Sequence, residues 1–169
     1  MDKKVLVAYA SKYGATAEIA EKIGEVLKQE GLQADVLPVK SVKNLAEYGA
    51  VVLGSGVYIA MWRKEAANFL KANEKLLTEK PVWLFSTGPG GEGDPVQLLK
   101  GWRFPKGLQP VIERIKPRDT AVFGGNVDAK KMNFIEKWMI KNVKSPVGDF
   151  RDWNAITKWA KDIAEAVNK

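Results

Sequence analysis

Residues 3–16 of the chain read KKVLVAYASKYGAT. The stretch begins with an apolar, partly β-branched run, which is typical of a parallel strand that is buried on both faces. It ends in SKYGAT, which is small and polar around Gly14, and from Thr16 onward apolar residues recur at helical spacing. The stretch therefore predicts a strand, a tight turn and a helix, the first unit of a parallel α/β sheet.

The same alternation of strand and helix continues along the rest of the chain. Further strands are predicted at 32–39, 50–56, 81–87 and 120–127, and further helices at 62–77, 106–116 and 152–167. Pro38 disfavours a central place for the second strand, which is therefore expected near a sheet edge. Strands joined by right-handed crossovers, with helices on both faces, suit an α/β three-layer sandwich with a five-stranded parallel sheet of order 2-1-3-4-5.

The length of the chain, 169 residues, favours a single domain over 1–169. Two connections, 88–105 and 128–152, are longer than usual for a compact domain. Loops of that length usually have a function, so both are expected to contribute to binding.

The composition restricts the chemistry that the protein's own side chains can perform. The sequence has no cysteine and no histidine, which excludes disulfides, thiolate nucleophiles, Ser-His-Asp catalysis and nearly all zinc sites. We therefore predict no catalytic residue and no metal site, and we expect any reactive group to belong to a cofactor. No apolar run reaches the roughly 20 residues that span a bilayer, and the start of the chain lacks signal-peptide features, so a cytoplasmic location is expected.

The net charge of +7 is unevenly distributed, because the whole excess of basic residues lies in 96–151. This asymmetry indicates an anionic partner, with a solvated basic face as the alternative. Within that part, 130–144 suits an amphipathic helix that contacts a membrane surface peripherally, on the inner face of the membrane. The alternative is that its apolar stripe packs on the domain's own core. No nucleic-acid partner is expected, since nothing here matches a known nucleic-acid module.

The glycine-rich stretch GPGGEG at 88–93 matches the pattern G-x-G-x-x-G of dinucleotide-binding proteins. That pattern belongs in the first βα turn, where its third glycine lets the helix pack closely on the strand. Here it follows the fourth strand, and Asp94-Pro95 begins at best a short helical turn. A dinucleotide site is therefore not expected at 88–93.

The first βα turn, SKYGAT at 11–16, has the features of a phosphate-binding loop instead. Ser11 and Thr16 supply hydroxyl groups, and Gly14 permits a tight turn with close backbone approach. The helix N-terminus adds exposed N–H groups and the positive end of a dipole. The alternative is a plain strand-to-helix turn, with Thr16 as the N-cap and Ser11 merely polar.

Two more turns are expected beside this loop. The turns at 55–58 and 86–91 follow the third and fourth strands, which lie next to the first strand in a 2-1-3-4-5 sheet. One loop would hold a phosphate, and the other two would present amides, hydroxyls and an aromatic ring to a flat ring system, which outlines an FMN site. The predicted cofactor-binding residues are Ser11, Lys12, Tyr13, Gly14, Ala15, Thr16, Ser55, Gly56, Val57, Tyr58, Ser86, Thr87, Gly88, Pro89, Gly90 and Gly91.

Over its whole length the sequence resembles the flavodoxin superfamily. Flavodoxins carry T-x-T-G-x-T in the first turn, and SKYGAT matches its first hydroxyl, its glycine and its last hydroxyl, with Tyr13 in place of the middle threonine. The resemblance implies a flavodoxin-like fold and FMN as the cofactor. It also implies that an aromatic side chain, Tyr58 or Trp62, stacks on the isoalloxazine ring.

The C-terminal part is similar to a narrower group, the flavodoxin-like, menaquinone-dependent protoporphyrinogen oxidases. The stretch GGNVDAKKMNFIEKWMIKNVK at 124–144 resembles their basic segment, and Asp152-Trp153 resembles the D-W that opens their last helix. This resemblance implies an FMN-dependent oxidoreductase of heme biosynthesis that passes electrons to a quinone or another redox partner. A flavodoxin-type electron carrier, an NAD(P)H:quinone reductase and a flavin-free binding module are the alternatives.

Overall fold

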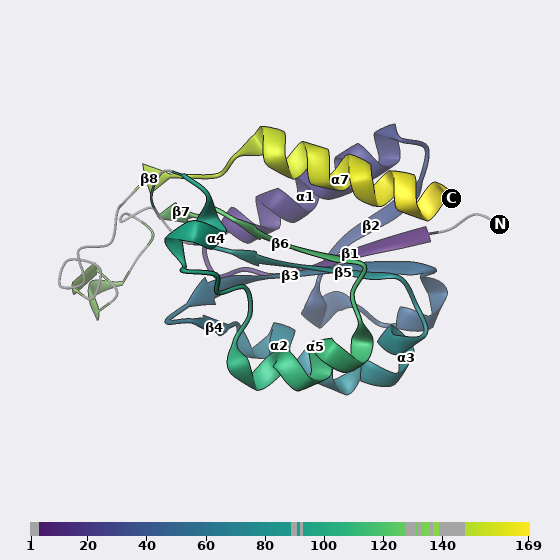
Figure 1. The fold of residues 1–169 in the computed structure, drawn as a ribbon, viewed down its shortest axis with the longest axis horizontal. Coiled ribbons are helices and arrows are strands. Elements are labelled where there is room, and N and C mark those ends of the chain that lie inside the picture. The colour runs from purple at the N-terminus through teal and green to yellow at the C-terminus, as the bar shows by residue number, and fades with distance from the viewer. Residues whose placement is uncertain are drawn as a thin grey trace.

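The computed structural model describes residues 4–88, 91, 93–127, 131, 133–135, 137, 138 and 148–169. Within these residues a parallel sheet lies between two layers of helices (Figure 1). The sheet has the order β2-β1-β3-β5-β6, with β4 attached to β3. Counting only the parallel strands, this is the predicted order 2-1-3-4-5, with the second strand at an edge, so the predicted fold class is confirmed.

The elements follow one another as strand and helix in the predicted alternation. The strands are β1 (Lys4–Ala10), β2 (Gln33–Pro38), β3 (Ala50–Tyr58), β4 (Met61–Trp62), β5 (Val82–Thr87), β6 (Asp119–Phe123), β7 (Asn126–Val127) and β8 (Gly148–Asp149). The α-helices are α1 (Ala15–Gln29), α2 (Lys64–Ala72), α3 (Glu74–Thr78), α4 (Pro95–Leu98), α5 (Gln109–Ile115) and α7 (Trp153–Asn168). Short 3-10 turns lie at Val39–Ser41, Leu45–Glu47 and Lys106–Leu108.

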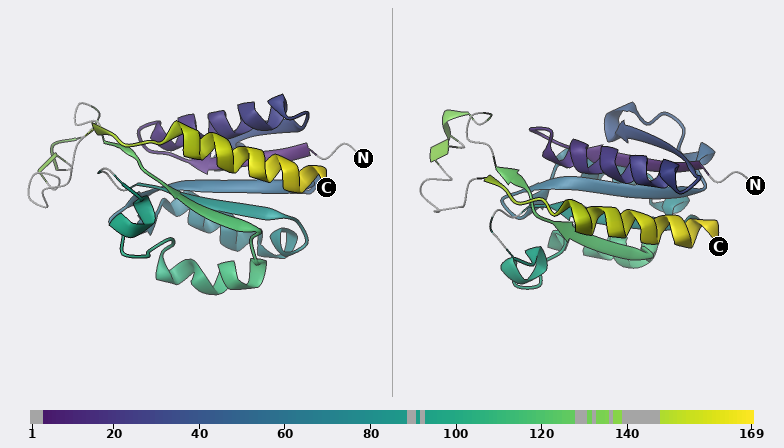
Figure 2. Two further views of the ribbon diagram at one scale, coloured as in Figure 1. Left: turned by 45° about the horizontal axis from the view of Figure 1, so that its top comes forward. Right: turned by 90° about the horizontal axis from the view of Figure 1, so that it is seen from above.

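Each face of the sheet carries its own hydrophobic core, because successive side chains of a strand point to opposite faces. The helices α1 and α7 cover one face and α2, α3 and α5 cover the other (Figures 1 and 2). On the α1 face, the Phe85 ring lies 6.0 Å from Trp159 and 5.9 Å from Phe123, measured between ring centroids. On the opposite face Leu53 and Leu84 are completely buried. This packing fixes the positions of the strand ends on which the site is built.

The helix predicted at 62–77 differs from the structure in two ways. It begins two residues later, because Trp62 belongs to β4, which folds back antiparallel on the end of β3. It is also interrupted at Asn73, whose side-chain amide donates to the Phe69 carbonyl oxygen at 2.8 Å and leaves the helix in two pieces. Asparagine competes with the backbone for such hydrogen bonds, which weakens helix interiors.

The strand predicted at 120–127 is also shorter than expected. β6 ends at Phe123, and the following residues Asn126–Val127 pair antiparallel with β8 in a separate ribbon. The backbone carbonyl of Phe150 lies where a side chain at Gly124 would be, and the Phe150 N–H donates to the Gly125 carbonyl oxygen at 2.9 Å. The chain leading into α7 therefore crosses the end of β6 and stops the strand there.

Candidate functional site

The carboxyl ends of β1, β3 and β5 lie in register, so the loops after them meet at one edge of the sheet. Ala10 lies opposite Ser55 across the β1–β3 pair, and Ser55 lies opposite Ser86 across the β3–β5 pair. The next pair of the β3–β5 ladder is Gly56 and Thr87. The stretch 55–58, predicted as a turn, is instead the last part of β3, because the strand continues to Tyr58 to pair with β4. The described residues of 11–16, 55–58 and 86–91 lie at the point where the strand order reverses, which is where open α/β sheets bind their ligands.

The first turn is built as a tight loop that leads directly into α1. The Ser11 hydroxyl oxygen accepts a hydrogen bond from the Gly14 N–H at 3.0 Å. Gly14 is the N-cap and has a φ of 94°, a left-handed conformation that glycine adopts without strain. Because α1 begins at Ala15, Thr16 lies inside the first helical turn and is not the N-cap that the alternative interpretation required.

Thr16 and Thr87 lie on the α1 face of the sheet on either side of Gly56. A side chain at Gly56 would come within 3.1 Å of the Thr16 hydroxyl, so the missing Cβ keeps this space open. Thr87 lies opposite Gly56 in register and points to the same face as Phe85, two residues before it. Its hydroxyl is buried and has no hydrogen-bond partner in the described part of the chain.

The unpaired hydroxyl of Thr87 fits a bound FMN. Buried polar groups in folded proteins are almost always hydrogen-bonded, and each exception needs an explanation. This one lies at the edge where the three predicted loops meet. A cofactor with carbonyl, amide and phosphate groups would supply the missing partner.

Two other predicted hydroxyls are occupied within the protein. Ser55 donates its proton to the Gly56 carbonyl oxygen at 2.9 Å, and Ser86 donates its proton to the Arg103 carbonyl oxygen at 2.7 Å. Ser86 also accepts from the indole N–H of Trp62 at 2.9 Å. Contacts from these two serines to a ligand would therefore come from the backbone or from remaining lone pairs.

The two aromatic candidates have different environments. Trp62 is buried against the Phe104 ring, with 5.8 Å between the centroids, so it has no free face for a flavin. Tyr58 is 44% exposed at the end of β3. The Lys12 ammonium lies 5.3 Å from the Tyr58 ring centroid and 5.2 Å from that of Tyr13, which links the first and second turns. Only Tyr58 remains a candidate for stacking.

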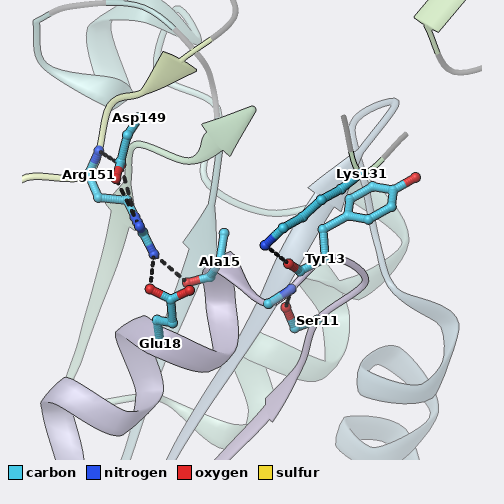
Figure 3. Close-up of polar contacts among 8 residues, drawn as sticks. Ser11, Tyr13, Ala15, Glu18, Lys131, Asp149 and Arg151 are labelled. Carbon is cyan, nitrogen blue, oxygen red and sulfur yellow. Dashed lines mark hydrogen bonds and ion pairs between the residues drawn. The ribbon is translucent and has the colours of Figure 1, made fainter. Parts of the chain in front are cut away.

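An arginine far along the chain secures the first turn of α1, as Figure 3 shows. The Arg151 side chain is only 6% exposed. It donates to both oxygens of Asp149 at 2.8 and 2.9 Å and to Glu18 at 3.1 Å, and it reaches the Ala15 carbonyl oxygen at 3.5 Å. Its hydrogen bonds hold the pKa of the Asp149 carboxyl below its usual range. No local pattern could have indicated this role, since Arg151 and Glu18 lie 133 positions apart.

Part of the predicted site and most of the predicted amphipathic helix lie outside the described residues. Of the predicted cofactor-binding residues, Pro89 and Gly90 lie outside the described residues, whereas Gly88 and Gly91 are described. Of 130–144, only 131, 133–135, 137 and 138 are described. The Lys131 ammonium donates to the Tyr13 carbonyl oxygen at 3.4 Å, so this stretch reaches the first turn (Figure 3). Among the described helices, none is long and apolar enough to cross a membrane.

Comparisons of the sequence and of the structure with known proteins agree on one family. A family model described as a flavodoxin domain matches residues 6–154, most of the chain. The structure is similar to that of a flavodoxin from the domain Archaea, with a TM-score of 0.59, 18% identity, and coverage of 98% of this chain and 99% of that one. The similarity in structure supports the flavodoxin-like fold. The match to the family model also supports FMN as the cofactor.

Two curated proteins with known activities are also similar. One is protoporphyrinogen IX dehydrogenase [quinone] of Escherichia coli strain K12, 22% identical over 98% of this chain and 97% of its own length. The other is NAD(P)H dehydrogenase (quinone) of Rhodopseudomonas palustris strain TIE-1, 28% identical over 40% of this chain and 45% of its own length. Both names describe oxidoreductases that use a quinone.

Proposed function

Since this chain belongs to the flavodoxin domain family and is an FMN-binding redox protein, we propose that it is an oxidoreductase of the protoporphyrinogen oxidase type that passes electrons to a quinone. The observation that carries this proposal is the similarity to protoporphyrinogen IX dehydrogenase over nearly the whole length of both chains. An electron-carrier flavodoxin is usually acidic, whereas this chain carries a net charge of +7.

In this proposal the residues of the three turns bind and orient the cofactor. Backbone N–H groups at the start of α1 and the Thr16 hydroxyl hold the phosphate, helped by the positive end of the helix dipole. Thr87 donates or accepts a hydrogen bond inside the site, and Tyr58 covers the ring system. The bound flavin supplies the redox chemistry. No side chain of the protein is proposed as an acid or a base.

A second candidate function is an NAD(P)H:quinone reductase. The partial similarity to NAD(P)H dehydrogenase (quinone) favours it. That similarity covers well under half of this chain, whereas the similarity to the porphyrinogen enzyme covers nearly all of it. The two candidates share the cofactor and the acceptor and differ only in the electron donor.

Anaerobic reduction of the FMN-loaded protein tests the proposal. Protoporphyrinogen, NADPH and a low-potential one-electron donor are added in separate experiments, and bleaching of the flavin absorbance is followed, with the apoprotein as the control. We expect rapid bleaching by protoporphyrinogen and recovery when a soluble menaquinone analogue is added. Bleaching by NADPH alone would assign the protein to the reductases, and bleaching by the low-potential donor alone would make it an electron carrier.

A further inference from the structure

The large apolar side chains that stay exposed in the described residues are gathered at one end of the molecule. This is the end toward which the parallel strands run, opposite the end where β1 begins and α7 finishes (Figures 1 and 2). They belong to the β3–β4 hairpin, to α4, to the described part of 131–138 and to the start of α7. They are Tyr58, Ile59, Met61, Leu98, Phe134, Ile135, Trp138 and Trp153.

The tip of the β3–β4 hairpin is the most unusual part of this surface. Ile59 and Ala60 have φ values of 50° and 56°, so two non-glycine residues adopt the left-handed conformation. A two-residue hairpin turn with both central residues left-handed normally contains asparagine, aspartate or glycine. For a β-branched residue this conformation is a genuine outlier and is strained.

Ile59 is unfavourable at this position for a second reason. Its side chain is 66% exposed, and Met61 beside it is 60% exposed, so neither gains from burial in the protein. Asparagine or glycine would relieve the strain and remove apolar surface from water at the same time. Neither backbone preference nor burial among the described residues accounts for an isoleucine here, and strain of this kind commonly marks a functional position.

We propose that the hairpin tip, Ile59 with Met61, inserts into the surface of an anionic lipid bilayer, together with the exposed side chains Phe134, Ile135 and Trp138. This extends the membrane contact predicted from the 130–144 pattern to a second, separate projection on the same end of the molecule. The inference goes beyond the redox proposal and is independent of it, since lipid binding requires neither a donor nor a quinone.

Charge complementarity selects an anionic bilayer as the occupant of this surface. Lys12 lies over the Tyr58 ring next to the hairpin, and Lys131 and Lys137 are exposed beside the apolar residues of 131–138. Of the carboxylates at this end, those of Glu18 and Asp149 are paired with Arg151, and those of Asp94 and Asp152 cap the helices α4 and α7. Exposed apolar side chains can enter the acyl-chain region of a bilayer, while lysines beside them contact the anionic headgroups. Each such lysine adds to the attraction between the protein and the bilayer.

Sedimentation with liposomes tests the proposal directly. The FMN-loaded protein is mixed with vesicles of phosphatidylcholine alone or with about 30% phosphatidylglycerol, at low and at high salt. We expect binding only to the anionic vesicles and its loss at high salt, because salt screens the lysine charges. Ile59→Asn should weaken this binding by about tenfold, since one apolar side chain no longer leaves water. The same substitution should raise the Tm by about 2–4 °C through relief of strain.

The adjacent residue provides a matched control. Ala60→Gly relieves the strain at the same turn but keeps Ile59, so the Tm should rise while binding to anionic vesicles stays unchanged. The membrane contact of the isoleucine is established if Ile59→Asn raises the Tm and weakens lipid binding, while Ala60→Gly raises the Tm and leaves lipid binding unchanged.

A spectroscopic measurement distinguishes insertion from general attraction. Because the chain has no cysteine, Ile59→Cys creates a single site for an environment-sensitive dye, and Glu165→Cys on the far part of α7 is the control. The emission should shift to shorter wavelength with anionic vesicles at position 59 and not at 165. The proposal is overturned if the unmodified protein fails to sediment at low salt, or if Ile59→Asn leaves binding unchanged. A dimer that Ile59→Asn dissociates would also overturn it, since the surface would then belong to a second copy.

Discussion

The substitution Thr87→Val tests the candidate site through two effects of opposite sign. The Thr87 hydroxyl is buried and has no partner in the described part of the chain, and a group left in this state costs about 1–3 kcal/mol. Valine has nearly the same shape without the hydroxyl and is equally suited to a strand. We therefore expect the apoprotein to gain about 1–2 kcal/mol in its free energy of unfolding, which corresponds to a Tm rise of about 2–8 °C.

The same change should weaken FMN binding. If the hydroxyl forms a hydrogen bond with the cofactor, its loss costs about 0.5–1.5 kcal/mol, or roughly a twofold to tenfold increase in Kd. Urea unfolding of the apoprotein gives the stability, and quenching of FMN fluorescence on titration gives the Kd. Thr87→Ser is the matched control, because it keeps the hydroxyl and removes only a methyl group. It should lower the stability and leave the Kd within about twofold.

The reasoning fails if Thr87→Val destabilises the apoprotein and leaves the Kd for FMN unchanged. That result would mean that the hydroxyl has an internal partner in solution and no contact with the cofactor. An increase in stability with an unchanged Kd would show that the hydroxyl is unpaired but lies away from the flavin.

Three further predictions concern the first turn of α1, its anchor and the far end of the sheet. Thr16→Ala should weaken FMN by about tenfold or more and riboflavin much less, because a charge-assisted hydrogen bond to the phosphate is worth about 1.5–3 kcal/mol; equal losses for both ligands in fluorescence titrations would exclude a phosphate contact. Arg151→Gln should raise the lowered pKa of Asp149 toward its usual value. A lowered carboxyl pKa adds stability that disappears as the pH falls through that pKa. The variant should therefore be less stable at neutral pH and should lose less stability on acidification, followed by circular dichroism. Burial, followed by the hydrogen bond to Asp35 at 2.7 Å, raises the pKa of Tyr48 to about 12. The stability that the neutral Tyr48 contributes is complete below pH of about 10 and disappears as the pH rises through 12. In Tyr48→Phe the free energy of unfolding, measured with urea, should therefore fall less steeply with pH in this range. The same steepness in both proteins would contradict this assignment.

The alternation of strands and helices could be predicted because local spacing encodes it. The apolar run before Ser11, the helical stripe after Thr16 and the edge position of the strand containing Pro38 all depend on residues within a few positions of one another. The register of parallel strands then determines which turns meet, so the topology alone was sufficient to group 11–16, 55–58 and 86–91. The fold class and FMN as the cofactor followed from these patterns together with the resemblance to flavodoxins.

The tertiary structure decided which of the predicted groups are available to a ligand. Trp62 looked like a stacking residue, but its indole N–H, in β4, donates a hydrogen bond to the Ser86 hydroxyl of β5, and its ring is buried. Thr87 looked no different from Ser86, yet among the buried side chains of the described residues its hydroxyl is the one without a hydrogen-bond partner. These outcomes depend on contacts between segments that lie far apart along the chain.

The anchoring of the first turn and the strain of the hairpin are also properties of the folded chain. Arg151 meets Glu18 across 133 positions, and no window of local sequence contains both. Ile59 has its left-handed conformation in a two-residue turn that is followed directly by Trp62 and Arg63, which donate hydrogen bonds to Ser86 of β5 and to Ser55. Local sequence determined the elements and their order through hydrophobic spacing and backbone preference. Long-range packing determined which hydroxyls, rings and charges remained available at the site, because each group binds whichever partner the fold brings within hydrogen-bonding distance.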